Sequence, residues 1–492
     1  MKAINPLVVI VAALGAELGC VFIVFLIGVD MSTTFSVVSP VDGQVLAEYG
    51  YASGEDIRQA LEASQQVALT WQNTPLAQRK VLVGQAIDWL VSQRDRIAEA
   101  IAQQIGRPIA QAAGEVRGLE ERARHMIAIA DEALADNYPA PKEGFTRFLR
   151  REPLGTVLVL APWNYPFLTA INTIVPALVA GNRVILKHSS QVPLVAKIFD
   201  EAFKAAGLPN GVFQVLHMTH DDTLALIGSE GIDFVAFTGS VEGGRTVQRA
   251  AAERFIGLGL ELGGKDPAYV RADADLNNAV ENLVDGAFFN SGQSCCGVER
   301  IYVHASLYDD FVAQFVELTK GYRFGNPMDA NTNLGPMVRA RAADFVRQQI
   351  ADAVAAGAKT LIPAGHFTHD APGTAYLAPQ VLVDVDHRMR LMTEESFGPV
   401  IGIMPVSGDE EALRLMNDSD FGLTASIWTT DADAAMALAD QIETGTVFMN
   451  RCDYLDPALA WTGVKDTGRG VSLSALGYAQ LTRVKSIHFR TA

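Results

Sequence analysis

The chain has 492 residues, which is too long for one ordinary domain and sufficient for two or three. Hydrophobic residues make up 49% and charged residues 19%, so large buried cores can form and general disorder is excluded. Acidic residues outnumber basic residues by 56 to 39, and the net charge of −17 without a long basic run argues against a nucleic-acid partner.

The first 30 residues form an apolar segment. Residues 6–29 are almost wholly apolar apart from Glu17, and about 20 such residues can span a bilayer. Three interpretations are open: a membrane anchor, a signal peptide, or translated sequence upstream of a natural start at Met31. The first basic residue after the run is Arg58, so the positive-inside rule would export the rest of the chain from the cytoplasm. We favour the upstream start and a cytoplasmic location, with a membrane anchor as the alternative.

The next part of the chain is predicted to be helical, and the part after it is predicted to alternate between strands and helices. Residues 54–135 carry apolar side chains near helical spacing. After a break at 138–141, short β-rich runs alternate with helical stretches, which is typical of βαβ units and a parallel sheet. The expected strands are 155–160, 183–187, 211–216, 233–237 and 257–262. The expected helices are 167–180, 193–206, 223–228 and 243–252.

A second α/β stretch follows, from about residue 266 to residue 450. Its expected strands are 300–304, 381–385, 399–406, 424–429 and 446–450, and residues 480–490 resemble a further strand. Parallel sheets bind ligands at the carboxyl ends of their strands. The glycine-rich dinucleotide fingerprint is missing, because the first strand runs into Ala161-Pro162-Trp163-Asn164.

One cysteine lies in a setting that suits a nucleophile. Gly292-Gln293-Ser294-Cys295-Cys296 places it among small residues, where a loop or helix start can favour the reactive thiolate. The alternative is a buried structural cysteine, which is the better interpretation of this segment taken alone.

Two further polar residues follow predicted strands. Glu261 ends an apolar run, and a carboxylate in a cleft can act as a general base for water. Asn164 lies in the turn after the first strand, where its amide can donate to an oxyanion. The ordinary alternatives are a solvated charge and a turn asparagine, and each is favoured when its segment is considered alone.

Together, these segments resemble the aldehyde dehydrogenase superfamily, from about Phe35 to Phe489. Glu261 and Cys295 are 34 positions apart, which fits the family spacing. Six motifs in the family's order are far more specific than any one of them, so the ordinary alternatives lose their support. The motifs are Ala161-Pro162-Trp163-Asn164, Lys187, Phe237-Thr238-Gly239-Ser240, Glu261-Leu262-Gly263-Gly264-Lys265, Gly292-Gln293-x-Cys295 and Glu394-Glu395-Ser396-Phe397-Gly398-Pro399.

The resemblance implies oxidation of an aldehyde to the carboxylic acid with NAD(P)⁺. Cys295 would attack the carbonyl, while Asn164 and the Cys295 backbone N–H hold the oxyanion. Hydride transfer to the nicotinamide would leave a thioester, and water activated by Glu261 would hydrolyse it. The family motif selects Cys295 rather than Cys296. Relatives that transfer the acyl group to CoA or phosphate do not need the carboxylate, so Glu261 argues against them, and no metal site is expected.

The resemblance also assigns the cofactor contacts. Lys187 would contact the adenosine ribose, Ser240 the pyrophosphate with Gly239 beside it, and Glu395 the nicotinamide ribose. Phe397 lies beside Glu395 in the motif, and Trp163 would flank the nicotinamide.

Two departures from the family pattern bear on the cofactor site. The family often has a glutamate where this chain has Ser190, and a carboxylate there would repel a 2′-phosphate, so both NAD and NADP are expected cofactors. The turn after the third strand carries His217 and His220, which we interpret as surface histidines rather than metal ligands.

The implied fold is α/β with three parts. A Rossmann-like dinucleotide-binding domain would comprise residues 31–142 and 153–262, and an α/β catalytic domain residues 263–450. Residues 143–152 and 476–492 would form a small β oligomerisation arm, which implies a homodimer or homotetramer. The expected partner is a small-molecule aldehyde, with no nucleic acid, and with a membrane only if residues 6–29 are an anchor.

Overall fold

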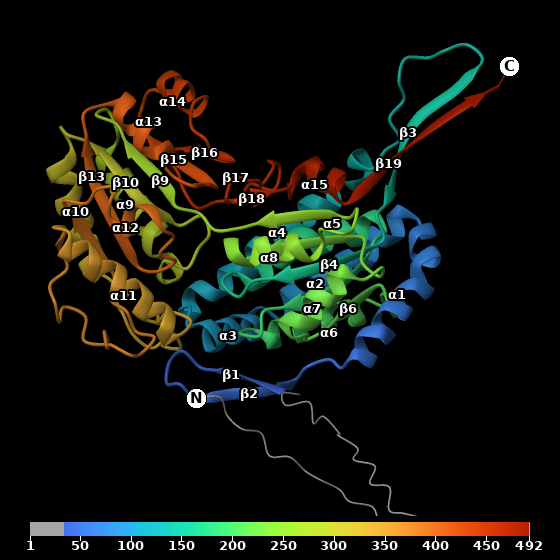
Figure 1. Ribbon diagram of the computed structural model, residues 1–492, viewed down its shortest axis with the longest axis horizontal. Coiled ribbons are helices and arrows are strands. Elements are labelled where there is room, and N and C mark those ends of the chain that lie inside the picture. Colours follow the sequence, from blue (N-terminus) through green and yellow to red (C-terminus); the bar gives the residue numbers. More distant parts are fainter. Residues whose placement is uncertain (1–33, 492) are drawn as a thin grey trace, which may run out of the picture.

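The computed structural model describes residues 34–491, and it has the α/β architecture with parallel sheets that the sequence predicted (Figure 1). A six-stranded sheet in the order β18-β8-β7-β4-β5-β6 forms the first lobe, and a seven-stranded sheet in the order β11-β12-β13-β10-β9-β15-β16 forms the second. The apolar segment 1–30, with its alternatives of anchor and upstream start, lies outside the described residues. Within the described part, no helix is both long and apolar enough to cross a membrane.

The first sheet forms where the hydrophobic runs predicted it. Its parallel strands are β4 (Thr156–Ala161), β5 (Arg183–His188), β6 (Phe213–Val215), β7 (Phe234–Thr238) and β8 (Gly257–Glu261). The short antiparallel strand β18 (Gly468–Arg469) joins the edge beside β8. The lobe's helices are α1 (Gly54–Asn73), α2 (Leu76–Ser92), α3 (Arg94–Ile105), α4 (Ile109–Ala133), α5 (Pro166–Ala180), α6 (Pro193–Ala205), α7 (His220–Gly228) and α8 (Val241–Ala250).

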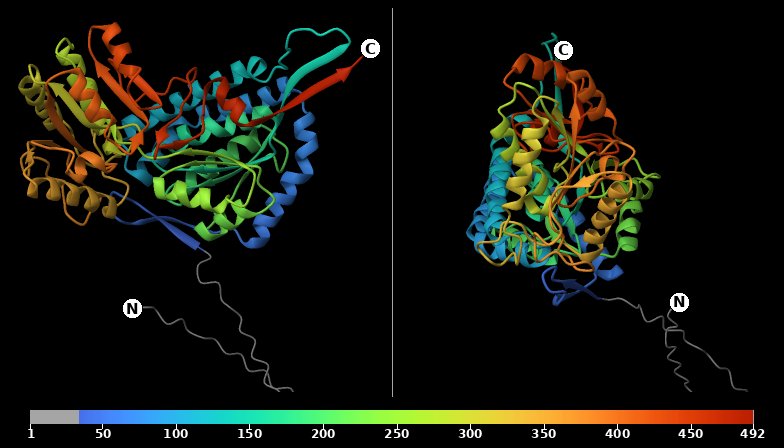
Figure 2. Two further views of the ribbon diagram at one scale, coloured as in Figure 1. Left: turned by 45° about the horizontal axis from the view of Figure 1, so that its top comes forward. Right: turned by 90° about the vertical axis from the view of Figure 1, so that its left-hand side faces the viewer.

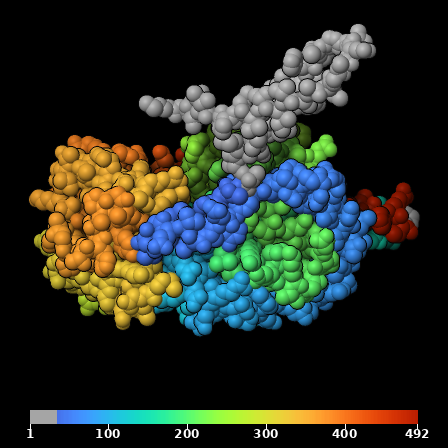
Figure 3. Space-filling model, turned by 90° about the horizontal axis from the view of Figure 1, so that it is seen from below, coloured from blue at the N-terminus to red at the C-terminus, as the bar shows by residue number. Residues whose placement is uncertain are grey.

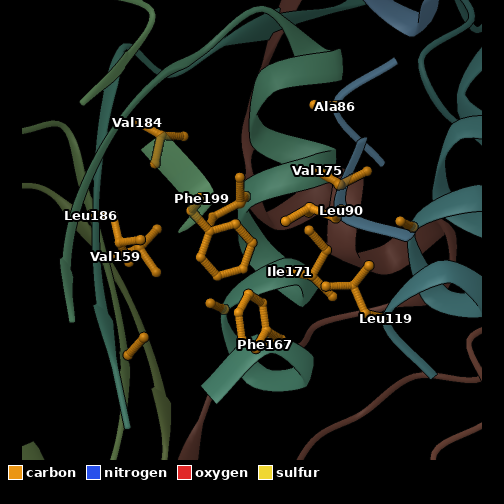
Figure 4. Packing of buried hydrophobic residues seen from close by; sticks show 14 of the residues in the cluster. Ala86, Leu90, Leu119, Val159, Phe167, Ile171, Val175, Val184, Leu186 and Phe199 are labelled. Atoms are coloured by element: carbon orange, nitrogen blue, oxygen red, sulfur yellow. The ribbon is translucent and has the colours of Figure 1, made fainter. Parts of the chain in front are cut away.

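Helix α5 is at the centre of the first core. It starts at Pro166, which suits a first helical position because the missing N–H would have no partner there. Phe167, Ile171 and Val175 recur every fourth residue and form one fully buried face. Figure 4 shows this face between side chains of the sheet on one side and of helices α2 and α4 on the other: Val159, Val184 and Leu186 facing Leu90 and Leu119.

The second lobe adds strands that the sequence did not all reveal. Its sheet contains β9 (Asp266–Val270), β10 (Val298–His304), β11 (Lys359–Thr360), β12 (Gln380–Val383), β13 (Val400–Val406), β15 (Thr424–Trp428) and β16 (Thr446–Met449). Strand β9 was missed because it has five residues and starts with Asp266-Pro267, which are poor strand formers. The helices of the second lobe are α9 (Leu276–Phe288), η1 (Phe289–Gly292), α10 (Tyr308–Lys320), α11 (Ala340–Ala355), α12 (Arg390–Thr393), α13 (Asp409–Asn417) and α14 (Ala432–Ala439). The small pair β14 (Phe421–Gly422) and β17 (Val464–Lys465) and helix α15 (Ser474–Gln480) complete the chain before the last strand.

A hairpin that the sequence did not predict lies on the surface. Strands β1 (Thr34–Val38) and β2 (Val45–Gly50) pair antiparallel and run over the first lobe towards the second (Figure 3). Phe35 and Tyr49 of the hairpin pack against His217, with ring centroids 5.6 and 5.5 Å away. The interpretation of His217 as a surface histidine was therefore only partly right, because its ring is half-buried under this hairpin.

A second antiparallel pair projects from the first lobe. Strand β3 (Phe145–Pro153) pairs with β19 (Thr482–Arg490) along its whole length, although the two are far apart in the sequence. Figure 2 shows this two-stranded arm extending away from the rest of the molecule. Strand β19 is mostly exposed and β3 is mostly half-buried, with Thr482 the one buried residue of the pair, so the arm contributes little to either core.

Candidate active site

Three of the sequence motifs meet at a cavity of about 220 Å³. They contribute Thr238, Glu261 and Cys295 to its lining. Helix α4 contributes Arg122, helix α9 contributes Asp285, and the loop after β16 contributes Asp453. Segments that lie far apart in the sequence, and come from both lobes, therefore share one small space.

The loop that carries Cys295 bends sharply before the cysteine. Asn290, Ser291 and Gly292 have consecutive positive φ angles of 53°, 57° and 69°, a conformation that costs energy for the two residues with a side chain. Glycine is required at 292, because a Cβ there would lie 2.3 Å from the carbonyl oxygen of Gly398. The cysteine loop is thus packed directly onto the Glu394–Pro399 motif.

Buried polar groups hold this loop in place. The Gln293 side chain accepts from the Val338 N–H at 2.8 Å and donates to the Asn290 carbonyl at 3.1 Å. The Ser291 hydroxyl donates to the carbonyl of Gly335 at 2.8 Å. These contacts satisfy polar groups that would otherwise be buried unpaired, so the strained loop has a single well-defined shape.

The two adjacent cysteines have different surroundings. Cys295 is half-buried on the cavity wall. Cys296 is only 4% exposed, and its thiol donates to Asp453 at 2.9 Å. The hydrogen bond with Cys295, burial and the negative Asp453 hold the pKa of Cys296 well above its usual range. Cys296 is therefore kept as a neutral thiol beside the more accessible cysteine.

Asn164 is fixed against the cysteine loop. It is 4% exposed, and its side-chain Nδ2 donates to the Gln293 carbonyl at 3.2 Å. Its backbone carbonyl accepts from Arg107, which also donates to the Asn290 side chain at 3.1 Å. Arg107 forms a fully buried ion pair with Glu115.

Glu115 in turn supports the start of helix α5. Its Oε1 accepts from the backbone N–H groups of Phe167 at 2.7 Å and Leu168 at 3.2 Å. Sequence reasoning missed both Arg107 and Glu115. The available signal was a pair of opposite charges, eight positions apart, in a segment otherwise rich in small and apolar residues.

Glu261 lies at the end of β8, as predicted, and two hydroxyls orient it. Ser472 donates to Oε1 at 2.6 Å, and Thr238 donates to Oε2 at 3.3 Å. Burial nevertheless raises the pKa of Glu261, because the charged form loses water. A carboxylate with a raised pKa is better able to accept a proton near neutral pH.

A second group of motif residues lies beside the first. The Glu395 side chain accepts from the Gly264 N–H at 3.0 Å, and burial raises the pKa of Glu395 to about 8. A Cβ on Gly263 would lie 2.4 Å from the Glu395 carboxylate, so only glycine leaves room for it. The Glu261–Lys265 and Glu394–Pro399 motifs are therefore in direct contact.

A buried ion pair holds the Glu395 loop. Lys265 pairs with Glu299 at 2.6 Å, and the Glu299 carboxylate accepts from the backbone N–H groups of Ser396 and Phe397, each at 2.8 Å. The Phe397 ring meets Trp163 edge to face, with centroids 5.7 Å apart. The structure thus brings together the two aromatic residues that the sequence placed beside the nicotinamide.

The remaining predicted residues follow the carboxyl ends of neighbouring strands. Lys187 is half-buried near the end of β5, and burial lowers its pKa. Ser190 is exposed in the following turn. Gly239 and Ser240 follow β7, and Ser240 caps helix α8 by accepting from the Gly243 N–H at 3.2 Å. Strands β5, β4 and β7 are adjacent in the sheet, so these residues lie along one edge.

His188 is the last residue of β5 and follows Lys187. Its Nδ1 accepts from the Ser189 N–H at 3.0 Å, so its Nε2 carries the proton and donates to the Pro166 carbonyl at 2.9 Å. Burial lowers the pKa of His188 to about 4. This neutral ring therefore has a structural role and joins strand β5 to the start of helix α5.

Comparisons with known proteins show what the whole chain is similar to. The sequence profile of the aldehyde dehydrogenase family matches residues 29–487. Succinate-semialdehyde dehydrogenase [NADP(+)] 1 of Mycobacterium bovis is 33% identical over 454 residues, which cover 92% of this chain and 99% of that protein. NADP-dependent glyceraldehyde-3-phosphate dehydrogenase from Bacillus halodurans, in complex with NADP, superposes with a TM-score of 0.88 at 32% identity, over 94% of this chain and 97% of that one. PnpE in complex with nicotinamide adenine dinucleotide superposes with a TM-score of 0.89 at 29% identity, over 93% and 94%.

Proposed function

The chain belongs to the aldehyde dehydrogenase family and is an NAD(P)-dependent aldehyde dehydrogenase, and on this premise we propose the roles of its own residues. Cys295 is the nucleophile, Asn164 the oxyanion donor and Glu261 the base of the hydrolytic step. One observation carries the proposal: Cys295 and Glu261 line the same cavity, and Asn164 is hydrogen-bonded to the loop that bears Cys295.

The first half of the reaction uses the thiolate and the oxyanion donors. The sulfur of Cys295 forms a bond to the aldehyde carbon, and the carbonyl electron pair moves to oxygen. One N–H of the Asn164 amide donates to Gln293, which leaves its second N–H for this oxyanion, beside the Cys295 backbone N–H. Such fixed donors typically contribute about 3 kcal/mol to transition-state stabilisation. Loss of hydride from the thiohemiacetal leaves a thioester on Cys295.

The second half uses Glu261. Its carboxylate accepts a proton from water, and the resulting hydroxide attacks the thioester carbonyl. The carbon–sulfur bond breaks, which releases the carboxylic acid and returns the thiolate. Cys296 does not suit the nucleophile's role, because its thiol is buried and already donates to Asp453.

The residues at the strand ends fit a nicotinamide dinucleotide. The N-terminus of α8, capped by Ser240, suits a pyrophosphate, and the Lys187 ammonium adds a positive charge nearby. Because Gly263 has no Cβ, the Glu395 carboxylate can lie beside it. A carboxylate at this position suits the hydroxyls of a ribose. When bound, the nicotinamide accepts the hydride that leaves the substrate. Phe397 and Trp163 contact each other edge to face, and we assign both to the nicotinamide end of this site.

The same proposal extends to assembly and location. The β3–β19 arm is a two-stranded ribbon whose apolar side chains Leu149, Val484 and Phe489 are 42%, 58% and 60% exposed. An isolated ribbon with exposed apolar groups gains from pairing with another chain. We infer that the arm joins two or four copies, and that the enzyme works in the cytoplasm, where a nicotinamide cofactor is available.

The experiment that tests these roles uses Glu261→Gln. The glutamine cannot accept the proton, so hydride transfer should proceed once and hydrolysis should stall. We expect a burst of reduced cofactor near one equivalent per site, together with an acyl adduct on the Cys295 peptide in mass spectrometry. The exposed Glu281→Gln on α9 is the matched control and should turn over normally. Steady turnover of Glu261→Gln at the wild-type rate, without an adduct, would remove Glu261 from its role.

The pH dependence provides a second readout of the same step. Glu261 must be deprotonated to act as a base, and burial raises its pKa. Hydrolysis in the wild-type enzyme should therefore slow as the pH falls through this raised pKa and recover as the pH rises. Stopped-flow measurement of hydrolysis against pH should show this step in the wild type and in Glu281→Gln. The residual hydrolysis of Glu261→Gln should lack it.

A further inference from the structure

Arg122 is an unusual cation in the cavity that contains Cys295. Its Nη1 donates to the Leu168 carbonyl and to the Asn172 side-chain oxygen, both at 3.3 Å and both neutral. Among residues 34–491, no carboxylate oxygen lies within 4 Å of the Arg122 guanidinium, which is the distance limit for an ion pair. Burial lowers the pKa of Arg122, because the guanidinium loses water and the negative charges of Glu115 and Glu261 only partly offset this loss. A ligand anion would supply a directly bonded counter-ion.

Besides Glu261, two further carboxylates line the same cavity. Asp453 accepts from the Cys296 thiol at 2.9 Å and from the Ser294 hydroxyl at 3.4 Å. Burial raises the pKa of Asp453 to about 6, and the like charge of Asp285 contributes. Desolvation also raises the pKa of Asp285. The charge of Arg122 acts on Asp453, but neither aspartate forms an ion pair within 4 Å with a cation of the described chain, so a ligand cation would stabilise both.

We propose that the substrate of this enzyme is a short amino acid semialdehyde, which carries a carboxylate and an ammonium group besides the aldehyde. Arg122 binds the carboxylate, and Asp453 together with Asp285 binds the ammonium. The inference rests on the proposed function, because it requires the aldehyde carbon to reach Cys295. All three charged side chains line the cavity that also contains the Cys295 sulfur.

The size of the cavity favours a small molecule. Its volume is about 220 Å³. A cavity of roughly 150 Å³ is large enough for benzene, so a four-carbon amino acid semialdehyde fits. The charged groups also lie near the reacting sulfur: Asp453 contacts Cys296, the neighbour of Cys295, and the charge of Arg122 acts on both cysteines and on Glu261. Long substrates would carry their charges beyond these groups.

A substrate with a single charge satisfies only half of this arrangement. An aldehyde with a carboxylate alone compensates Arg122 but leaves two carboxylates facing it without a cation. An aldehyde with an ammonium alone compensates the aspartates and leaves the guanidinium with neutral partners. Because unpaired charges in a partly desolvated cavity are costly, the doubly charged substrate gains most.

The test compares four aldehydes that differ only in these groups. They are 2-amino-4-oxobutanoate with both charges, 4-oxobutanoate without the ammonium, 3-aminopropanal without the carboxylate, and propanal without either. We expect kcat/KM for the doubly charged aldehyde to exceed that for each singly charged one by about tenfold or more, since charge-assisted hydrogen bonds have this strength. The formation of reduced cofactor measures each rate.

Variants then assign each charge to its partner. For each aldehyde, kcat/KM is divided by the value for propanal in the same variant, which cancels any general loss. Arg122→Met should lower this ratio about tenfold for both carboxylate-bearing aldehydes and spare the ratio for 3-aminopropanal. Asp285→Asn should lower the ratio for the two ammonium-bearing aldehydes instead. Arg117→Met, an exposed arginine on the same helix α4, is the matched control and should change no ratio.

Other outcomes overturn the inference. If 4-oxobutanoate is used as well as the doubly charged aldehyde, the acidic pair does not recognise an ammonium. If 3-aminopropanal is used best, Arg122 does not bind a carboxylate. Oxidation of propanal without preference among the four would reject the inference and leave the proposed function standing. The absence of both turnover and an acyl adduct on Cys295 with every aldehyde would reject the proposed function itself.

Discussion

The proposed catalytic end of the site and the end proposed for adenosine and pyrophosphate (the adenosine end) are built in different ways. At the catalytic end, buried groups from distant segments hold the reactive residues: Arg107 holds Asn164, and Ser472 holds Glu261. At the adenosine end, Ser190 and Ser240 are exposed. The only hydrogen bond described for the Ser240 side chain comes from its own helix turn, at Gly243.

This difference determines which residues can be substituted one at a time without a large loss of stability. Replacing a residue of the catalytic end leaves a buried partner unpaired, which typically costs about 1–3 kcal/mol in addition to any loss of chemistry. A change in an exposed turn usually alters stability by less than about 0.5 kcal/mol. We therefore expect the chemistry to depend on a network of buried groups and the choice of cofactor to depend on a few independent side chains.

The largest expected effect is at the nucleophile. Cys295→Ala removes the sulfur that forms the covalent bond, and we expect dehydrogenase activity to fall by roughly 10⁴-fold or more while cofactor binding persists. Cys296→Ala keeps the nucleophile and should retain most of the activity. Steady-state rates and cofactor titration by fluorescence measure the two effects. The opposite pattern in the two variants would mean that the neighbouring thiol reacts.

The next effect tests whether buried groups really hold the site. Glu299→Gln removes the ion-pair partner of the buried Lys265, and breaking such a pair should lower the free energy of unfolding by about 3–5 kcal/mol. The matched control is Glu317→Gln, which breaks an exposed pair with Lys320 of the same 2.6 Å length. That change should cost at most about 1 kcal/mol. Denaturant unfolding measures both, and equal losses would show that burial of the pair does not matter.

Asn164→Ala should follow in size. It removes one oxyanion donor, and kcat should fall about 10²–10³-fold, or about 2.7–4 kcal/mol in transition-state stabilisation. Asn282→Ala is the control, because that exposed amide only bonds within helix α9. An Asn164→Ala enzyme with unchanged kcat and a raised KM would show that the amide binds substrate rather than the oxyanion.

The same comparison explains what the sequence could reveal. Strands β4 to β8 lie within two residues of their predicted bounds, because continuous apolar runs between helical stretches specify a buried parallel sheet. Glu261 lines the cavity with Cys295, as the motif order implied. The supporting residues were not predictable. Ser472 is 211 positions from Glu261, and only the folded chain brings such residues together.

The local sequence was also insufficient for prediction where tertiary contacts determine the structure. The β1–β2 hairpin was missed because its side chains are mostly exposed and lack a clear apolar alternation. The partial burial of His217 was not predicted because nothing near it in the sequence shows that Phe35 and Tyr49 cover it. Residues of the exposed adenosine end, in contrast, were placed by motif position alone, and their roles therefore depend on experiment.

The smallest expected effect concerns Ser190, in the exposed turn after β5. A 2′-phosphate carries about −1.5 to −2 charges at neutral pH, and Lys187 lies three positions earlier at the strand end. Serine offers this phosphate a hydroxyl donor, so the wild-type enzyme should use both NAD and NADP. A glutamate would meet the phosphate with like charge but could accept from the two ribose hydroxyls of NAD. Ser190→Glu should therefore lower kcat/KM for NADP relative to NAD about tenfold, which corresponds to about 1.4 kcal/mol.

Ser92→Glu adds the same charge on the surface at the end of α2 and should leave the cofactor ratio unchanged. An unchanged ratio in Ser190→Glu, or a wild-type enzyme that does not use NADP, would place the discriminating contact at another residue of the adenosine end.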